Sequence, residues 1–251
     1  MSYEQLCAAL AFYTRFPVGR VVGAPDFAVA CWPVAVVGAL VGGMGGICAL
    51  LAYLAGLPTE IAGVVALAAM ALMTGALHED GLADFVDGVG GGVDRTARLA
   101  IMRDSRLGSY GALALCASML MRVFAIAHIF DSGGVAAVLV LAFIGAASRV
   151  AGLLPMRLLS PARMDGAAAG VRAPGWRALA VAAGVIIAFG GVLVLAGVAP
   201  LRMLAAALAA AFGALAATRV ARRAIGGYTG DVLGAAQQIA EIAALLVFSA
   251  R

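Results

Sequence analysis

Acidic residues crowd into one short stretch of this sequence. Of the 13 acidic residues in the 251-residue chain, six fall within that stretch: Glu79, Asp80, Asp84, Asp87, Asp94 and Asp104. In the segment HEDGLADFVDG, three aspartates follow the spacing i, i+4, i+7, so a helix would place their carboxylates on one face. Like charges at that spacing repel one another, and a cation bound between them removes the repulsion.

Carboxylate oxygens favour a hard cation such as Mg²⁺ or Mn²⁺. Such an ion keeps several water ligands, and the phosphates of a substrate complete its coordination shell. We therefore predict that Asp80, Asp84 and Asp87 bind Mg²⁺ and that Asp104 joins them. A solvated acidic helix end is the alternative, and the lack of basic partners at i+4 argues against it.

Two later segments carry groups that suit a phosphate. The segment IMRDSRLGSYG interleaves Arg103, Ser105 and Arg106 with an aspartate, and such donors form charge-assisted hydrogen bonds to phosphate. Positive charge at a cytoplasmic loop would explain the arginines but not this interleaving. In IGGYTGDVLGAAQQ, Thr229 or Asp231 is a candidate helix N-cap, and free amides at a helix start suit an anion. Glycine loops are common at helix starts, so the last signal is weak by itself.

Three further residues have the chemistry for a site. Arg122 and Arg149 fall inside apolar stretches, where a charge must face the bundle interior or a wet cavity. Arg122 could either pair with a carboxylate or contact a substrate, and the sequence favours neither. Arg149 is predicted to contact a substrate because it lies nearer the cytoplasmic half. His78 adjoins the carboxylates as a base or as a group behind them. The general base stays open between His78 and a metal-linked carboxylate, Asp80 or Asp84.

The composition indicates the elements that must position these residues. The chain is 64% hydrophobic and 12% charged, with a mean hydropathy of +1.06, whereas soluble chains are about half apolar and a quarter charged. The four cysteines stand singly, without zinc-binding spacing. About 20 apolar residues make a span, and such stretches fall at 33–56, 60–78, 110–130, 135–156, 178–198, 202–218 and 232–249.

The predicted fold class is therefore all-α: a polytopic integral membrane bundle of six or seven transmembrane helices. Irregular backbone cannot face lipid, so the membrane-crossing segments are expected to be helical. The last stretch carries a polar stripe, which predicts that it is buried against another element. We take residues 1–251 as one membrane-embedded domain, with 1–32 as an N-terminal segment at the membrane interface.

Arginines set the expected orientation. They gather in the predicted loops 79–109, 157–177 and 219–231, whereas the loops between them are short and hold one arginine. The positive-inside rule places the arginine-rich loops and the N-terminus in the cytoplasm. The stretch 79–109 is thus predicted to be a cytoplasmic catalytic loop.

Four ordered motifs resemble those of the cobalamin synthase family, the adenosylcobinamide-GDP ribazoletransferases. They are FYTRFPV (12–18), HEDGLADFVDG (78–88), IMRDSRLGSYG (101–111) and GGYTGDVLGA (226–235). The resemblance runs nearly end to end, and four motifs in order make it specific. One departure is the pair Phe85–Val86, which is bulkier than the family pattern and bears only on local packing.

The resemblance implies a reaction of adenosylcobinamide-GDP with α-ribazole or its 5′-phosphate, which gives the cobamide and GMP. It also implies Mg²⁺, corrinoid and ribazole substrates, no nucleic-acid partner, and the inner membrane of a bacterium. It adds Glu79 to the metal-binding acidic stretch. It places Arg15, the stretch Arg103–Arg106 and the glycine segment, with Thr229, Gly230 and Asp231, in the substrate site. A homo-oligomer and association with other enzymes of nucleotide-loop assembly both stay open.

Two other functions fit parts of the pattern. Phosphatidyltransferases that use CDP-alcohols space aspartates similarly, but Asp84 follows Ala83 where their pattern has arginine. A cation-coupled transporter would carry its ionisable site near the bilayer centre, between two related halves. The acidic residues here lie at the end of a predicted span, and the halves of the chain do not match.

Overall fold

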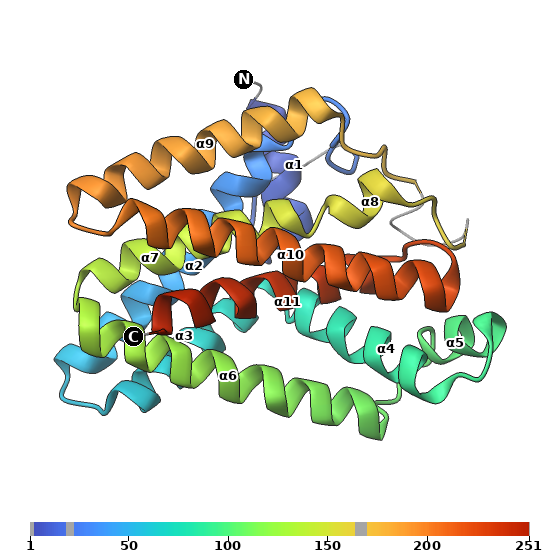
Figure 1. Cartoon of the computed structure of the whole chain (residues 1–251), viewed down its shortest axis with the longest axis horizontal. Coiled ribbons are helices and arrows are strands. Elements are labelled where there is room, and N and C mark those ends of the chain that lie inside the picture. Colours follow the sequence, from blue (N-terminus) through green and yellow to red (C-terminus); the bar gives the residue numbers. More distant parts are fainter. Residues whose placement is uncertain (1–2, 19–22, 164–169, 251) are drawn as a thin grey trace.

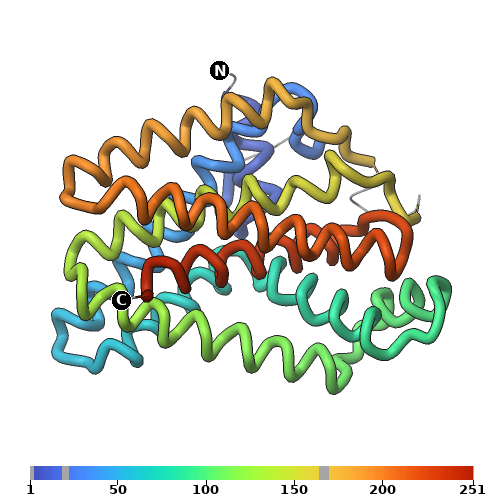
Figure 2. The backbone as a smooth tube through the Cα atoms, in the orientation of Figure 1, coloured from blue at the N-terminus to red at the C-terminus, as the bar shows by residue number. Residues whose placement is uncertain are grey.

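The computed structural model describes residues 3–18, 23–163 and 170–250, so parts of the expected interfacial segment 1–32 lie outside it. Within these residues the regular structure is helical (Figures 1 and 2), apart from one isolated bridge between Pro161 and Tyr228. The helices in chain order are α1 (Tyr3–Tyr13), α2 (Trp32–Leu54), α3 (Thr59–Thr74), α4 (Leu77–Gly91), α5 (Arg95–Ile101), α6 (Ser109–Gly133), α7 (Ala136–Ala151), α8 (Leu154–Leu158), α9 (Trp176–Leu195), α10 (Pro200–Ile225) and α11 (Gly230–Ser249).

Six helical segments in the described chain are long and apolar enough to span a membrane. They are α2, α6, α7 together with α8, α9, α10 and α11, with mean hydropathies between 1.6 and 2.7. The helices α3 and α4 pass the same test as a pair, although they meet at an angle of 91°. The expected all-α bundle with six or seven spans is confirmed, and the chain is a multi-span membrane protein.

The break between α3 and α4 corrects one predicted boundary. The span expected at 60–78 ends at Thr74, because Gly75 and Ala76 both adopt left-handed backbone, with φ of 67° and 57°. A non-glycine residue in that region costs roughly 1–2 kcal/mol. The side chain of Arg15 lies against Gly75, where a Cβ would come within 2.2 Å of the guanidinium Nε. Arg15 therefore covers the bend that leads into the acidic helix.

Two predicted loops are largely helical. The stretch 79–109, expected to be a catalytic loop, forms most of α4 and all of α5. The loop expected at 219–231 begins later, because α10 continues to Ile225 and carries its last arginines on helical turns. Alanine and arginine are good helix formers, so a helix can continue beyond its apolar stretch. Hydropathy alone therefore placed the end of α10 too early and did not predict the helices within 79–109.

The connections gather at opposite ends of the bundle. In Figure 1 the turns α2–α3, α6–α7 and α9–α10 lie at one end. The α4–α5–α6 region, α8 and the turn α10–α11 lie at the other end, which is the arginine-rich one. Because α3 starts at the first end and α4 finishes at the second, the bent pair crosses the bundle. The acidic helix thus runs from the interior of the bundle towards its arginine-rich end.

Close contact between α2 and α7 depends on glycine. A Cβ on Gly38 would lie 2.2 Å from the carbonyl oxygen of Gly145, and one on Gly42 would lie 2.2 Å from that of Leu141. Small residues let helix backbones approach closely in membranes, where packing replaces the hydrophobic effect as the driving force. This contact positions α7, which carries Arg149, next to the N-terminal part of the bundle.

We predict that Gly38→Ala destabilises the bundle. The added methyl group must separate α2 from α7, and such overpacking typically costs about 1–3 kcal/mol. The measurement is the thermal unfolding midpoint of the protein in detergent. Gly184→Ala is the control, because a Cβ at that position on α9 meets nothing within 4 Å. Equal midpoints for the two variants would contradict the tight contact between α2 and α7.

Candidate active site

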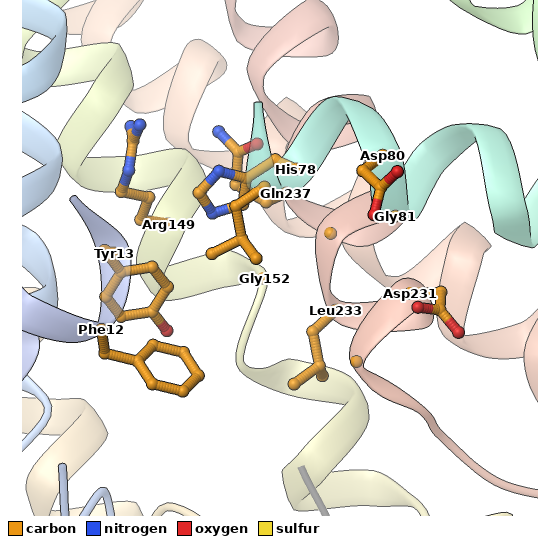
Figure 3. A pocket seen from close by; sticks show the side chains of 13 residues that line it. Phe12, Tyr13, His78, Asp80, Gly81, Arg149, Gly152, Asp231, Leu233 and Gln237 are labelled. Atoms are coloured by element: carbon orange, nitrogen blue, oxygen red, sulfur yellow. The ribbon is translucent and has the colours of Figure 1, made fainter. Parts of the chain in front are cut away.

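The bend at residues 75–76 directs α4 against the start of α11. The two helices touch through glycines: a Cβ on Gly81 would lie 3.1 Å from both the Asp231 carbonyl oxygen and the Gly234 Cα. This approach brings the first turns of α4 to the N-terminus of α11. Asp80 and Asp231, which are 151 positions apart in sequence, thereby line one cavity (Figure 3).

An acidic cluster forms at this junction. The carboxylate of Asp84 is repelled by those of Asp80, Asp231 and Asp87, and it is attracted by the guanidinium of Arg163. Asp80 is exposed, and Asp84 and Asp231 are half-buried. No group of three acidic, histidine or cysteine side chains in the described ranges is already arranged as a metal site. The cluster therefore offers carboxylate oxygens on one side of a prospective ligand and does not surround it.

The start of α11 is capped as the sequence predicted. The Thr229 hydroxyl accepts a hydrogen bond from the Val232 amide at 3.4 Å and donates one to the Asp231 carboxylate at 3.0 Å. Asp231 also forms an ion pair with Arg163, 3.6 Å long. The Thr229 cap thus fixes the orientation of Asp231, while Gly230 stays exposed at the helix start.

Arg163 lies beside the acidic cluster, and the sequence did not single it out. The Nη1 atom of its guanidinium is buried without a hydrogen-bond partner in the described part of the chain. Arg163 is held there because its segment pairs with the glycine segment: the Ala162 amide donates to the Tyr228 carbonyl at 2.8 Å and the Tyr228 amide to the Ser160 carbonyl at 3.0 Å. Nothing in the sequence separates it from its neighbouring loop arginines.

Three carboxylates expected to bind metal have other partners. Asp87 accepts hydrogen bonds from the Gly108 and Gly111 amides, both 2.8 Å, and so anchors the start of α6. Glu79 accepts from Arg122 at 2.9 Å and from Gln238 at 3.1 Å. The Asp104 carboxylate is bound by the guanidinium of Arg106 on the surface.

These contacts bear on the predicted metal ligands. Asp87 and Glu79 hold helices together, and the Arg106 guanidinium keeps the pKa of the Asp104 carboxyl below its usual range. Asp87 and Asp104 already have donors to both of their oxygens, whereas Glu79 has donors only to Oε1, and its buried Oε2 has no hydrogen-bond partner among the described residues. Asp80, Asp84 and Asp231 are the carboxylates at the junction that do not anchor a helix in this way.

A buried polar network surrounds Arg122 inside the bundle. Arg122 is 2% exposed and forms ion pairs with Glu79 and, at 2.8 Å, with Glu241. Gln237 donates to Glu241 at 2.6 Å and to Ser148 at 3.2 Å. The polar stripe of α11 thus faces inward, as its sequence predicted, and the question left open for Arg122 is answered by carboxylate partners.

The remaining predicted phosphate donors are exposed residues. Arg103, Ser105 and Arg106 are exposed on the segment between α5 and α6. Arg15 is exposed as well, and its backbone amide donates to the Met73 carbonyl at 2.8 Å. In the described structure these four residues are surface groups.

A cavity of about 230 Å³ opens beside the cluster. Figure 3 shows Asp80 and Asp231 at one end and Phe12, Tyr13 and Arg149 at the other. The rings of Tyr13 and His78 are stacked, with centroids 5.8 Å apart and planes inclined by 2°. The structure therefore brings His78, Arg149, Asp80 and Asp231 to a single cavity.

Comparison with known proteins gives the family. The sequence model of the family described as cobalamin-5-phosphate synthase matches residues 5–249. The chain belongs to this family. A protein of Azorhizobium caulinodans named adenosylcobinamide-GDP ribazoletransferase is 42% identical over 244 residues, covering 95% of this chain and 92% of its own. A Mesorhizobium japonicum protein of the same name is 43% identical, and the alignment covers 98% of this chain and 93% of that protein. No solved structure is significantly similar to the chain.

We predict that Arg122→Met unfolds the bundle more readily than a matched surface change. Removing one partner of a buried ion pair leaves carboxylates uncompensated and costs about 3–5 kcal/mol. The thermal midpoint in detergent measures the loss. Arg106→Gln removes an arginine from a surface pair whose guanidinium side chain is 87% exposed, and it should leave the midpoint unchanged. A midpoint for Arg122→Met equal to that of Arg106→Gln would mean that the network does not stabilise the fold.

Proposed function

We propose that this protein transfers a cobinamide phosphate from adenosylcobinamide-GDP to α-ribazole or α-ribazole 5′-phosphate. A ribose hydroxyl attacks the phosphorus on the cobinamide side of the diphosphate. The new oxygen–phosphorus bond forms, the bond to the bridging oxygen breaks, and GMP leaves with that oxygen. The hydroxyl proton passes to a base at the site or to solvent. Membership of the family and the names of the similar proteins support this assignment.

One observation supports the location of the reaction: the carboxylates of Asp80, Asp84 and Asp231 gather opposite Arg163, next to a cavity. Transfer of a phosphoryl group needs positioning and neutralisation of negative charge more than covalent chemistry by the protein. The cavity offers a place for one reactant beside the cluster. The partly unsatisfied guanidinium of Arg163 suits the negatively charged phosphates.

Mg²⁺ fits this donor set. The ion is commonly held by one or two carboxylates and completed by water and substrate phosphates, so a closed cage of protein ligands is not needed. Asp80, Asp84 and Asp231 would hold it, and their mutual repulsion favours a cation among them. When bound, such an ion neutralises charge on the diphosphate and on the leaving group.

The chain's own residues then have separate roles. Arg163 binds phosphate charge beside the carboxylates, and Thr229 keeps Asp231 oriented towards the site. His78, stacked on Tyr13 and lining the cavity, and the carboxylates of Asp80 and Asp84 are the candidates for the base. Arg103 and Arg106 lie on the surface between α5 and α6, where they can meet parts of the large donor substrate that project from the cluster.

We also propose that the arginine-rich end of the bundle faces the cytoplasm of a bacterium, across the inner membrane. The gathering of arginine-bearing segments at one end, with the acidic cluster towards that end, supports this orientation. The substrates and the GMP product are polar, and they would then reach the site without crossing the bilayer. A CDP-alcohol phosphatidyltransferase and a cation-coupled transporter are both disfavoured by the family match over residues 5–249.

We expect the purified protein in nanodiscs to release GMP from adenosylcobinamide-GDP only when α-ribazole or its phosphate and Mg²⁺ are present. Chelation with EDTA should stop the release, and added Mg²⁺ should restore it, because the carboxylates alone repel the diphosphate. GMP is measured by chromatography together with the corrinoid product. Release that continues in EDTA would remove the metal from the proposal, and no release from a folded sample would refute the activity.

Asp84→Asn is expected to lower turnover by at least about 100-fold, a loss typical of removing one group that stabilises a transition state. The fold should persist, because Asp84 makes no hydrogen bond or ion pair to another helix within the described residues and asparagine has nearly the same shape. Asp94→Asn is the matched control in the same acidic stretch. Asp94 caps α5 through the Ala97 amide at 2.9 Å, and asparagine caps equally well. Near-normal turnover of Asp84→Asn would exclude this carboxylate from the reaction.

A further inference from the structure

Arg149 is a buried cation that lacks an ion-pair partner among the described residues. It is 3% exposed, and its single hydrogen bond, from Nη1 to the Gly145 carbonyl, is long at 3.4 Å. Its Nε has no hydrogen-bond partner. A charged group inside a membrane protein is costly and is typically found at a functional site. Since Arg149 lines the cavity, its unused donors point to a ligand there.

The charges around Arg149 indicate what kind of ligand this is. Arg122 is paired with two carboxylates, Glu79 and Glu241, which leaves that group with one net negative charge. Arg149 is attracted by the same two carboxylates at longer range. The two arginines and two glutamates therefore balance without any ligand. A neutral hydrogen-bond acceptor suits Arg149 better than a phosphate, which would add uncompensated charge to the interior.

The size and the lining of the cavity further limit which ligand can bind there. Its volume of about 230 Å³ lies below the roughly 300–1,000 Å³ of pockets for drug-sized ligands, so a corrin macrocycle does not fit. Phe12, Leu77 and Leu233 give it apolar walls, and the stacked rings of Tyr13 and His78 form one side. These features suit a flat, neutral aromatic ring system.

We propose that this cavity binds the heterocyclic base of the ribazole substrate, with Arg149 donating a hydrogen bond to the free ring nitrogen. That nitrogen is a neutral acceptor, since the other ring nitrogen carries the ribose. The ribose then points towards Asp80 and Asp231 at the opposite end of the cavity, where the attacked diphosphate is placed (Figure 3). This inference rests on the proposed function and extends it, because the lining of the cavity would determine which bases the enzyme accepts.

Binding can be tested without turnover. Isothermal titration of α-ribazole into the protein in nanodiscs, with no adenosylcobinamide-GDP present, gives the Kd for wild type, Arg149→Met and Leu233→Trp. We expect each substitution to weaken binding about 10- to 100-fold, the first by removing a charge-assisted hydrogen bond and the second by filling the cavity. Leu246→Trp is the control for the second, because Leu246 lies on the same helix and is 46% exposed on the outer surface.

Steady-state kinetics separates binding from folding. Arg149→Met and Leu233→Trp should raise the KM for α-ribazole and leave the KM for adenosylcobinamide-GDP unchanged, whereas a folding defect would lower the active fraction without selecting one substrate. Wild-type protein that fails to bind α-ribazole, or variants that bind it as wild type does, would overturn the proposal. Loss of GMP release by wild type with intact α-ribazole binding would instead refute only the proposed reaction.

Discussion

The ion pair between Arg122 and Glu79 is the contact on which the site depends. Polar groups inside a membrane bundle have no bulk water to solvate them, so each must find a partner within the protein. Arg122 from α6 binds Glu79 at the start of α4 and Glu241 in the middle of α11. The three helices are thereby held at one depth, and Asp80, the neighbour of Glu79, is placed at the end of the cavity.

The carboxylates of the acidic helix α4 have two different roles. Some of them anchor the helix to its neighbours, and the others face the site. Glu79 holds its first turn against Arg122, and Asp87 holds its later turns through the amides of Gly108 and Gly111. Asp80 and Asp84 lie between these anchors, and their side chains have no hydrogen-bond partner in the part of the chain that the structure describes. A helix that carries repelling charges needs such anchors to keep its position. Two of the carboxylates thus stabilise the arrangement in which the other two face the site.

Hydropathy predicted the spans well, because a run of about 20 apolar residues has few alternatives in a bilayer. It could not predict the bend between α3 and α4, since Ala76 adopts a backbone conformation that its residue type disfavours. Nor could local spacing tell which carboxylates are anchors. Those roles depend on partners far away in sequence, such as Gln238, which lies 159 residues from Glu79. Arg163 was missed for the same reason, since its position follows from the pairing of residues 160–162 with Tyr228.

The two ends of the cavity differ in exposure and in charge. The acidic end combines an exposed Asp80 with half-buried Asp84 and Asp231, so water, ions and a large charged substrate can reach it. The other end is closed by aromatic rings and by Arg149, whose charge is balanced by the glutamates around Arg122. The ion pairs that fix α4 therefore also set the electrostatics of the apolar end. An arrangement in which Arg122 had only one carboxylate partner would leave a net positive interior and draw an anion into the cavity, away from the carboxylates at its mouth.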